Sequence, residues 1–465
     1  MRLIEGKSIP DLEEHLTNTQ LQEWKHIDAS TKHKEMLLKL IECVHHPDNK
    51  VENLNNVRVI FSDEFLIGKG NDGTRVYVGL GMDGCEKAVK RIRQDSCIKI
   101  AENEKKILNE GNAKYSQYVV NYSFYDENLG TEYVYLILDL CEESLKEYVE
   151  SNSNSLDYLQ KLLPDILKQI LKGLADLHRG PRPILHRDLK PSNVLRNAQG
   201  KFQIADFGIS RVLKNGFMTH VSDATKGTQD WMAPESFVVN EESFDKARYK
   251  PESDVMNAGM VAYYVATKGK HPFGPLKYRL KNLLDGNPVG LMEIDDVVLK
   301  DLLSWMLQHS PEDRPSAKKA LKHPYLLSDE EKFSMLCDMG NQPEMKKSEV
   351  TSSLNLDVIA QLYAPKEWMT RIDDKVLKDF KILKNNGKQK SLTYEPTWAG
   401  CLRFIRNVNE HWNDKPRTHL LRYVKEGKYV DYFLQCFPEL PLLVHKIIRS
   451  TDWKTRADLQ EHFTA

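Results

Sequence analysis

The sequence predicts an α+β chain in which a strand-rich region is followed by two helical regions. Between residues 57 and 140, short segments alternate or run apolar and are rich in β-branched and aromatic residues, which is typical of strands. From residue 144 to about 327 the pattern is mainly helical. A last block, 328–465, contains a strongly amphipathic helical pattern. The 465 residues are enough for two or three domains.

Composition and charge exclude several classes of protein. The chain is 40 % hydrophobic and 29 % charged, as in soluble globular proteins, and its net charge of −1 creates no global field toward nucleic acid or membranes. The seven cysteines include no C-x-x-C pair, so we expect free thiols and a cytoplasmic location. No apolar run of about 18 residues and no signal-peptide core is present, so we expect no membrane span.

Three regions follow along the chain. Residues 1–56 are expected to be a polar, mostly helical lead-in of unknown role, and a helix docked on the next domain is favoured there over a dedicated sensor module. Its apolar stripe has helical spacing and consists of Met36, Leu37, Leu40, Ile41 and Val44. Residues 57–327 form the second region, with a small lobe to about residue 141. Residues 328–465 form the third, in which the polar segment 340–353 is expected to be a loop.

The strand-rich region divides into separate elements at turn residues. One helix is expected at about residues 98–109. The expected strands are Val57–Leu66, Arg75–Leu80, Lys87–Ile92, Val119–Phe124 and Tyr133–Leu140.

Three strings in the second region indicate phosphoryl transfer. They are HRDLKPSN (residues 186–193), ADFGIS (205–210) and GTQDWMAPE (227–235). An Asp and an Asn five residues apart, followed by a second Asp before Phe-Gly, is the arrangement that γ-phosphoryl transfer needs. A lone HRD triplet would be an ordinary helix end, but the order and spacing of all three strings favour catalysis.

Each side chain in these strings has an expected role. Asp188 would accept the proton of the substrate hydroxyl, and Lys190 would stabilise the γ-phosphate. Asn193 and Asp206 would hold Mg²⁺ ions through their oxygens.

A glycine-rich string precedes these motifs. Gly68, Gly70 and Gly73 form G-x-G-x-x-G, which alone is a weak signal because dinucleotide-binding folds also use it. Here a strand with Val76 follows instead of a helix, which favours a hairpin that covers the phosphates of ATP.

The residues that would hold the nucleotide lie further along the strands. Lys90, in the string AVK, would contact the α- and β-phosphates, and Glu104 is its best partner, with Glu102 and Glu110 as alternatives. Asp139 to Cys141 would be the hinge whose backbone contacts adenine.

Other positions would support the site. Glu235 is expected to pair with Arg314, and Asp254 to brace the backbone of the catalytic loop. Arg187 can receive a phosphate carried by the following segment. The hydroxyl residues of that segment are Ser210, Thr219, Ser222, Thr225 and Thr228. Thr228 is expected to shape the loop beside the substrate, and the sequence does not choose among the others.

These motifs resemble those of the protein kinase family over about residues 57–327. The resemblance implies a bilobal kinase fold with ATP and Mg²⁺ as cofactors and serine/threonine specificity. All residues needed for phosphoryl transfer are present, and a catalytically silent kinase fold stays open as an alternative.

The segment WAGCLRFIRNVNEHW (residues 398–412) carries a second set of reactive side chains. One helical face is apolar and the opposite face is polar. The apolar face consists of Trp398, Cys401, Leu402, Ile405, Val408 and Trp412. The polar face consists of Arg403, Arg406, Asn407, Glu410 and His411. A histidine can protonate a leaving 5′-oxygen, and arginine and asparagine can hold a phosphate, although a solvated face with one histidine is the ordinary case. Upstream lies a basic run, Lys375, Lys378, Lys381, Lys384, Lys388 and Lys390.

FIRNVNEHW after a kinase region resembles the kinase-extension nuclease domain shared by RNase L and the kinase-endoribonuclease sensor of the unfolded protein response. The resemblance covers about residues 60–465 and implies an all-α nuclease domain in 328–465. It implies that His411 is the general acid, that Arg406 and Asn407 bind the scissile phosphate, and that Tyr394 positions or deprotonates the 2′-hydroxyl of RNA.

The same resemblance implies a dual serine/threonine kinase and metal-independent endoribonuclease that cleaves RNA, not DNA. Nucleotide binding, homodimerisation and autophosphorylation, with the chain itself as protein substrate, would activate it. No ankyrin repeats, lumenal domain or membrane span are seen in the sequence, so it leaves the trigger of dimerisation open. The alternatives are a kinase with a non-catalytic C-terminal interaction domain, a nuclease on a silent kinase fold, and a non-enzymatic adaptor that recruits a partner through residues 1–56.

Overall fold

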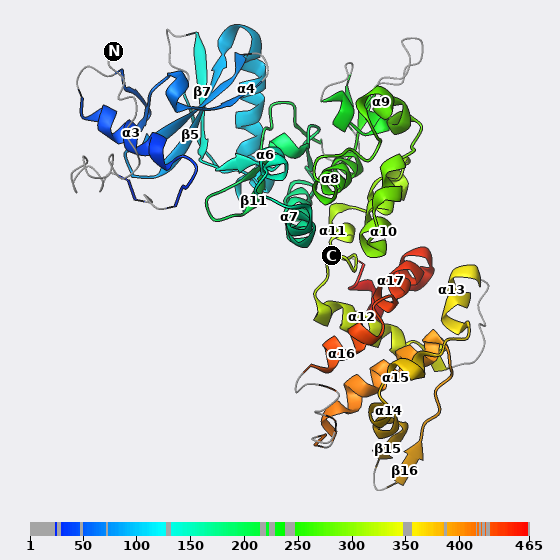
Figure 1. Cartoon of the computed structure of the whole chain (residues 1–465). Helices are drawn as coiled ribbons and strands as arrows, with labels where there is room; N and C mark the ends of the chain where they lie inside the picture. Colours follow the sequence, from blue (N-terminus) through cyan, green and yellow to red (C-terminus); the bar gives the residue numbers. More distant parts are fainter. Residues whose placement is uncertain are drawn as a thin grey trace. The chain divides into compact units, whose positions relative to one another are not determined.

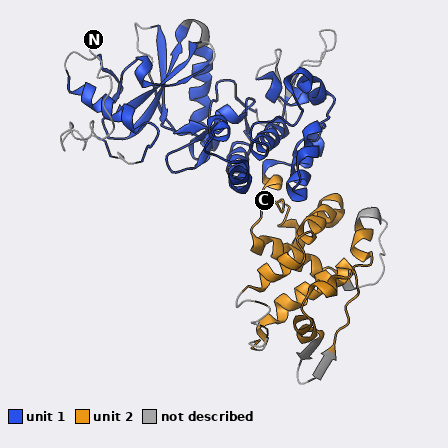
Figure 2. Cartoon of the chain, viewed as in Figure 1, with its two compact units in different colours: residues 1–317 blue, residues 318–465 orange. Residues whose placement is uncertain are grey.

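The computed structural model describes part of the chain. It covers residues 24–463 except for residues 26–28, 47–49, 71–72, 127–131, 214–219, 223–227, 238–246, 347–355, 386–387, 415, 418–419, 421–423 and 425–427. The chain divides into two compact units, residues 1–317 and 318–465 (Figure 2). Strands and helices both contribute to unit 1 and helices dominate unit 2, which confirms the α+β class.

An antiparallel sheet forms the small lobe of unit 1 (Figure 1). Its strands are β1 (Glu52–Leu54), β2 (Val57–Val59), β3 (Leu66–Lys69), β4 (Arg75–Gly81), β5 (Glu86–Arg93), β6 (Tyr122–Asp126) and β7 (Tyr133–Asp139). Their order is β1-β2-β4-β5-β7-β6, with β3 also paired to β4. Central β5 is therefore held on both sides, which fixes the side chains that point from it.

The single strand predicted for Val57–Leu66 is wrong. The chain forms β2 and β3 instead, and a 3₁₀ turn at Asp63–Phe65 separates them. Phe65 is buried, so this turn serves to place an aromatic ring in the core. The predicted strand at Val119–Phe124 begins only at Tyr122, because Val119 forms an isolated bridge with Ile204 of the large lobe.

Three helices accompany the sheet. They are α3 (Lys34–Val44), α4 (Gln94–Leu108) and the short α5 (Gly111–Lys114). The helix predicted at about residues 98–109 is confirmed as α4, which starts directly after β5. The apolar side of α3 packs on strands β4 and β5.

Helices and short strands make up the large lobe of unit 1. The helices are α6 (Leu145–Glu150), α7 (Leu156–Leu177), α8 (Pro251–Ala266), α9 (Leu276–Leu284) and α10 (Val297–Met306); α11 (Ala317–Ala320) follows at the unit boundary. The strands are β8 (Glu143–Ser144), β9 (Ile184–Leu185), β10 (Val194–Arg196), β11 (Phe202–Ile204), β12 (Arg211–Val212), β13 (His220–Ser222) and β14 (Ala247–Tyr249). The small sheets β11-β10-β8 and β12-β9 hold the loops that carry the predicted catalytic residues.

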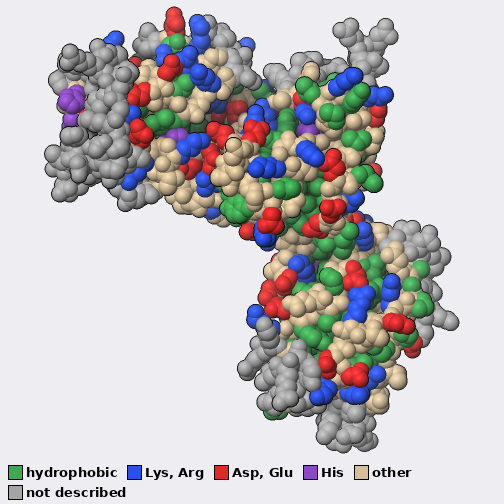
Figure 3. Space-filling model, in the orientation of Figure 1, with side chains coloured by type: hydrophobic (Ala, Val, Ile, Leu, Met, Phe, Trp, Pro, Cys, Tyr) green, Lys and Arg blue, Asp and Glu red, His purple; other side chains and the backbone are tan. Residues whose placement is uncertain are grey.

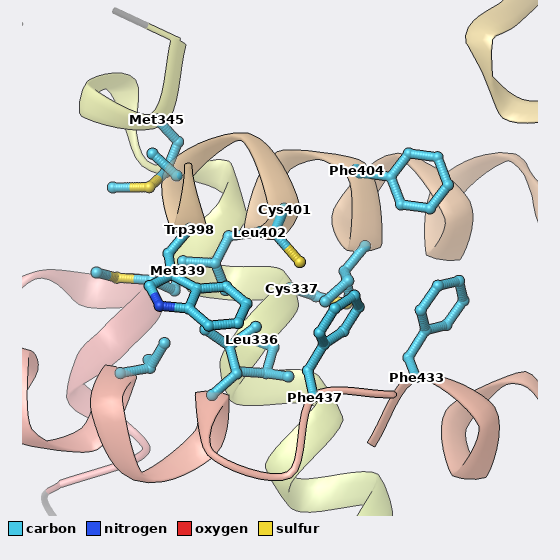
Figure 4. Close-up of a cluster of buried hydrophobic side chains, with 14 of the residues drawn as sticks. Leu336, Cys337, Met339, Met345, Trp398, Cys401, Leu402, Phe404, Phe433 and Phe437 are labelled. Carbon is cyan, nitrogen blue, oxygen red and sulfur yellow. The ribbon is translucent and has the colours of Figure 1, made fainter. Parts of the chain in front are cut away.

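Unit 2 is a helical cluster with one hairpin. Its helices are α12 (Asp329–Asn341), α13 (Leu356–Tyr363), α14 (Asp374–Lys381), α15 (Trp398–His411), α16 (Tyr429–Cys436), α17 (Leu440–Ser450) and α18 (Ala457–Gln460). The hairpin joins β15 (Ile382–Asn385) to β16 (Lys388–Ser391). Aromatic and sulfur side chains from α12, α15 and the α16–α17 region fill the core, as Figure 4 shows for Cys337, Cys401 and Phe404.

The loop predicted for residues 340–353 begins later than expected. Helix α12 continues to Asn341, and a 3₁₀ turn follows at Pro343–Lys346. Residues 347–353 lie outside the described residues. Gly340 lies where α12 crosses α15. A Cβ at this position would meet the Leu402 carbonyl oxygen and approach Arg406 Cβ to 2.9 Å, so the absence of a side chain lets the two helices come this close.

Surface charge is mixed. Basic and acidic side chains alternate over the visible face without a large field of one sign (Figure 3), in keeping with the net charge of −1. Among the described helices, none is both long and apolar enough to pass through a bilayer.

The close approach of α12 and α15 generates a first prediction. Replacing Gly340 with Ala should lower the stability of the C-terminal unit by about 1–3 kcal/mol, because backbone and not a flexible side chain meets the added methyl. Urea unfolding followed by tryptophan fluorescence measures the change. Gly111→Ala is the matched control, since its Cβ would meet only Tyr115 at 3.8 Å. Equal midpoints for Gly340→Ala and the wild type would contradict this packing.

Candidate active sites

The glycine-rich turn connects β3 and β4. Gly70 N–H donates to the Thr74 carbonyl at 2.9 Å, and Gly73 has φ +76°, a conformation that favours glycine. Asn71 and Asp72 lie outside the described residues. Gly68 pairs with Val76 in the β3–β4 register, and Val76 pairs with Lys90 across β4 and β5. The hairpin thus places the glycine turn, Val76 and Lys90 in neighbouring positions.

Lys90 connects β5, on which it lies, to helix α4 and to the loop that carries Asp206. Its ammonium donates to Glu104 Oε2 of α4 at 2.7 Å and to Asp206 Oδ1 at 3.0 Å. The predicted pairing with Glu104 is therefore present. The two alternatives do not make it: Glu102 is exposed, and Glu110 pairs with Arg182 at 3.0 Å.

The Lys90 ammonium stays ionised because two neighbouring carboxylates compensate its charge. Burial opposes the charge of Lys90, but the carboxylates of Asp206 and Glu104 raise its pKa above the ordinary value. Lys90 in turn lowers the pKa of Asp206, whose side chain is 47 % exposed. Burial raises the pKa of Glu104, which is 1 % exposed. The accessible carboxylate is therefore that of Asp206, the residue predicted to hold a metal ion.

The predicted hinge, Asp139 to Cys141, begins at the last residue of β7. The Asp139 carboxylate accepts from Lys87 Nζ at 2.8 Å and from Asn121 Nδ2 at 3.0 Å. These bonds hold the hinge to the sheet. Burial raises the pKa of Cys141 to about 12, so this thiol stays protonated.

The catalytic loop is a dense network centred on Asp188. One carboxylate oxygen, Oδ2, accepts from Lys190 Nζ at 2.8 Å and from Asn193 Nδ2 at 3.0 Å. The other, Oδ1, accepts from the N–H of Thr228 at 3.0 Å and from its hydroxyl at 2.8 Å. Asn193 uses its nitrogen for this network, so its side-chain oxygen is the atom left for a cation.

Buried Asp254 braces the loop, as predicted from the sequence. Its carboxylate accepts from the backbone N–H groups of His186 and Arg187, both at 2.9 Å. His178 Nε2 lies 2.9 Å from the same carboxylate. Burial opposes ionisation, but the bond from His178 and the surrounding donors lower the pKa of Asp254. The strained φ of +73° at Arg187 is held by these bonds.

Arg187, next to Asp188 in the catalytic loop, has spare hydrogen-bond donors among the described residues. Arg187 is 3 % exposed; it donates to the Ile209 carbonyl at 3.2 Å and lies over Tyr249 at 3.8 Å. Its Nε and Nη2 have no hydrogen-bond partner among the described residues. These two N–H groups could therefore bind the phosphate of a phosphorylated residue.

The structure narrows the set of hydroxyl residues in the segment after Asp206. Ser210 is fully buried and donates to the His186 carbonyl at 2.9 Å, so it is not accessible to a kinase. Thr228 bonds to Asp188. Thr219 and Thr225, and the side chain of Ser222, lie outside the described part.

The predicted pair of Glu235 and Arg314 is present in the large lobe. Arg314 Nη1 and Nη2 donate to the two carboxylate oxygens of Glu235 at 2.7 and 2.9 Å. The guanidinium is fully buried. This bidentate pair fixes the end of the GTQDWMAPE string.

In unit 2 the predicted helix is confirmed as α15, capped by Thr397, whose hydroxyl accepts from Gly400 N–H at 3.2 Å. The sequence predicts one buried apolar face and places Asn407 on the opposite polar face, but burial extends to Asn407 as well. Asn407 is 7 % exposed, because Tyr394 packs over this side of the helix. The helix is therefore buried on more than its apolar stripe.

Three of the predicted nuclease residues form one chain of hydrogen bonds. Asn407 Nδ2 donates to the Tyr394 hydroxyl at 2.9 Å, and Arg406 Nη1 donates to Asn407 Oδ1 at 3.1 Å. Asn341 at the end of α12 accepts from Arg406 Nε at 2.6 Å. Burial raises the pKa of Tyr394 although Asn407 and two arginines oppose it. The phenol is therefore protonated at neutral pH and can act as a hydrogen-bond donor.

His411 lies one helical turn beyond Asn407, and no bond joins it to that chain in the described residues. Its Nδ1 lies 2.9 Å from Asp414 Oδ2, and the ring is 31 % exposed. A carboxylate at Nδ1 orients an imidazole so that Nε2 is free to exchange a proton.

Sequence reasoning missed Asn341 and Asp414. Asn341 lies in the polar segment 340–353, which the sequence predicts to be a loop, whereas it is the last residue of α12. Asp414 carried an available signal, because an acidic residue three positions after a histidine reaches it across a helical turn.

The basic run begins on α14 with Lys375 and Lys378 exposed. It ends in the β15–β16 hairpin, where the side chains of residues 382–390 lie outside the described part of the chain.

Comparison with known proteins agrees with this geometry. A protein kinase domain model matches residues 61–326, and a ribonuclease 2-5A model matches residues 332–463. The chain is 30 % identical over 403 residues to the serine/threonine-protein kinase/endoribonuclease ire-1 of Caenorhabditis elegans, covering 84 % of this chain and 39 % of that protein. It is 31 % identical over 424 residues to the kinase/endoribonuclease IRE2 of Homo sapiens, covering 87 % and 42 %.

A plant relative gives the same picture. The kinase/endoribonuclease IRE1 of Oryza sativa is 31 % identical over 412 residues, covering 84 % of this chain and 43 % of that protein. The chain thus spans about two fifths of the length of these relatives. Since one family model covers more than half of the chain and the second follows it directly, the chain belongs to the protein kinase family, in the group whose kinase domain is followed by a ribonuclease 2-5A domain.

Proposed function

We propose that this chain is a serine/threonine protein kinase and a metal-independent endoribonuclease. The kinase domain would span residues 57–327 and the endoribonuclease domain residues 328–465. The observation that carries the proposal is that both sets of reactive side chains are assembled. Lys90 bonds to Glu104 and Asp206 in unit 1, and Tyr394, Asn407 and Arg406 are linked in unit 2.

In the kinase cleft, ATP would lie between the glycine turn and the catalytic loop, with its adenine at the hinge. Lys90 would hold the α- and β-phosphates, and Lys190 the γ-phosphate. Asp188 would accept the proton of the attacking hydroxyl, after exchanging its bonds with Thr228 for that hydroxyl. Asp206 and Asn193 offer a carboxylate and an amide oxygen, the ligands that suit Mg²⁺, which supplies charge neutralisation at the phosphates.

In the nuclease domain, the 2′-hydroxyl of RNA would give up its proton to solvent water as its oxygen attacks the adjacent phosphorus. The bond from phosphorus to the 5′-oxygen breaks, and His411 gives that oxygen a proton, which leaves a 2′,3′-cyclic phosphate. Arg406 and Asn407 would stabilise the charge that builds on the phosphate oxygens. The protonated phenol of Tyr394 would position the 2′-hydroxyl by hydrogen bonding and not act as a base.

Control would run through nucleotide binding, homodimerisation and autophosphorylation, as the resemblance to the kinase-extension nucleases implies. Arg187, with two donors unbonded among the described residues, supports a phosphorylated segment as one input. The six cysteines with described side chains are not disulfide-bonded, which supports a cytoplasmic location. RNA and a second copy of the chain are the expected partners.

The kinase half is tested by Asp188→Asn. Phosphate incorporation from labelled ATP, with the chain itself as substrate, should fall about 100-fold or more, because the variant carboxamide cannot accept the hydroxyl proton. Lys161→Ala is the control, since Lys161 is exposed on the surface and its ammonium pairs with the exposed Asp157 carboxylate. Equal incorporation by wild type and Asp188→Asn, or none by the wild type, would favour the silent kinase fold.

The nuclease half is tested by His411→Ala. Cleavage of a stem-loop RNA in EDTA should fall by about 10²–10⁴, because the leaving oxygen loses its proton donor. Asn407→Ala should also lose cleavage. Glu410→Ala, an exposed change on the same helix, should retain it.

The ends of the RNA fragments add a second readout, since a 2′,3′-cyclic phosphate identifies attack by the 2′-hydroxyl. If the wild-type chain leaves RNA intact while it phosphorylates itself, unit 2 is an interaction domain and the nuclease proposal fails.

A further inference from the structure

A segment ahead of the matched kinase domain contacts the hinge. We call residues 30–44, which include α3, the hinge clasp. They precede the residues matched by the kinase model, 61–326. Their partners are Cys141 of the predicted hinge, Glu142 directly after it, and strands β4 and β5.

The first contact is a carboxylate that receives several donors. Glu142 is 4 % exposed, and its Oε2 accepts from Thr31 N–H at 3.2 Å, from the Thr31 hydroxyl at 3.1 Å and from Lys32 N–H at 2.8 Å. Burial opposes ionisation, but the bonds from the clasp lower the pKa of Glu142. The clasp therefore supplies hydrogen-bond donors to the ionised carboxylate of Glu142, the residue that directly follows the hinge.

The second contact is a buried imidazole. His33 is 4 % exposed, and its Nε2 lies 3.2 Å from the Cys141 carbonyl oxygen and 3.0 Å from the Glu142 carbonyl oxygen. Carbonyl oxygens only accept hydrogen bonds, so Nε2 carries the proton and donates to the hinge backbone. Burial lowers the pKa of His33, with Lys32 acting in the same direction and Glu142 against it. The ring is therefore neutral near pH 7.

The third contact is apolar. Leu37, Leu38, Leu40 and Ile41 of α3 are fully buried in a cluster with Leu140 of the hinge and Ala88 of β5. Ala88 and Lys90 are two residues apart on β5, so their side chains share one face of the sheet. The helix thus packs on the face that carries the predicted ATP lysine. Figure 1 shows α3 beside the sheet of the small lobe.

We propose that the hinge clasp is a positioning element for the nucleotide, in which His33 and the Glu142 bonds fix the hinge backbone in its binding conformation. The inference rests on the nucleotide binding of the proposed function. A hinge that must be ordered on binding loses conformational entropy, and one that is already ordered does not. His33 acts through Cys141 and Glu142 and is a positioning residue, not a catalytic one.

The test measures the affinity of full-length protein for ADP with Mg²⁺ by calorimetry. His33→Ala should weaken binding roughly three- to tenfold, because the two carbonyls lose their donor. His33→Gln, whose amide N–H₂ can donate to the same carbonyls, should recover most of the affinity. His46→Ala, an exposed histidine just beyond α3, should bind as the wild type does. In kinase assays, His33→Ala should raise KM for ATP and leave kcat near its wild-type value.

Thr31→Val provides a second variant that removes only one hydroxyl donor to Glu142 and should weaken ADP binding by a smaller factor. Equal or tighter ADP binding by His33→Ala overturns the positioning role and makes the clasp a structural support or an inhibitory cover. Absence of ADP binding by the wild type overturns the nucleotide binding of the proposed function, and this inference with it.

Discussion

The cleft of unit 1 depends on one buried ammonium. Lys90 must be neutralised where it stands, because an uncompensated charge inside a protein costs several kcal/mol. Its two carboxylate partners come from α4 and from the loop at Asp206, so one requirement ties the sheet, a helix and this loop of the large lobe together. Glu104 is sealed and Asp206 is half exposed, which separates the structural partner from the one that remains available to a cation.

A different constraint organises unit 2. Helices α12 and α15 approach closely at Gly340, and this contact sets Asn341 against Arg406. From there, bonds run through Asn407 to Tyr394. The close packing of α12 on α15 therefore positions the hydrogen-bonded side chains from Asn341 to Tyr394. His411 is held separately by Asp414.

How much of this could be predicted depends on how local the signal is. The Lys90–Glu104 and Glu235–Arg314 pairs, the Asp254 brace and helix α15 follow from motifs or periodicity, and the structure contains each of them. The burial of Asn407 was missed, because helical periodicity describes one apolar face and does not show which neighbour covers the other. The turn at residues 63–65 was missed for a related reason, since an apolar run conceals where tertiary packing needs a bend.

The hinge clasp changes where the folding unit of the kinase begins. A chain cut at residue 57 or 61 would expose Leu80, Ala88 and Leu140, which α3 now covers, and would leave Glu142 without the amides of Thr31 and Lys32. Such a fragment would contain every predicted catalytic motif of the kinase domain. It would nevertheless expose the apolar surface beside the cleft that α3 covers in the longer chain. Aggregation or weak activity of that fragment would then reflect the place of the cut and not the chemistry of the domain.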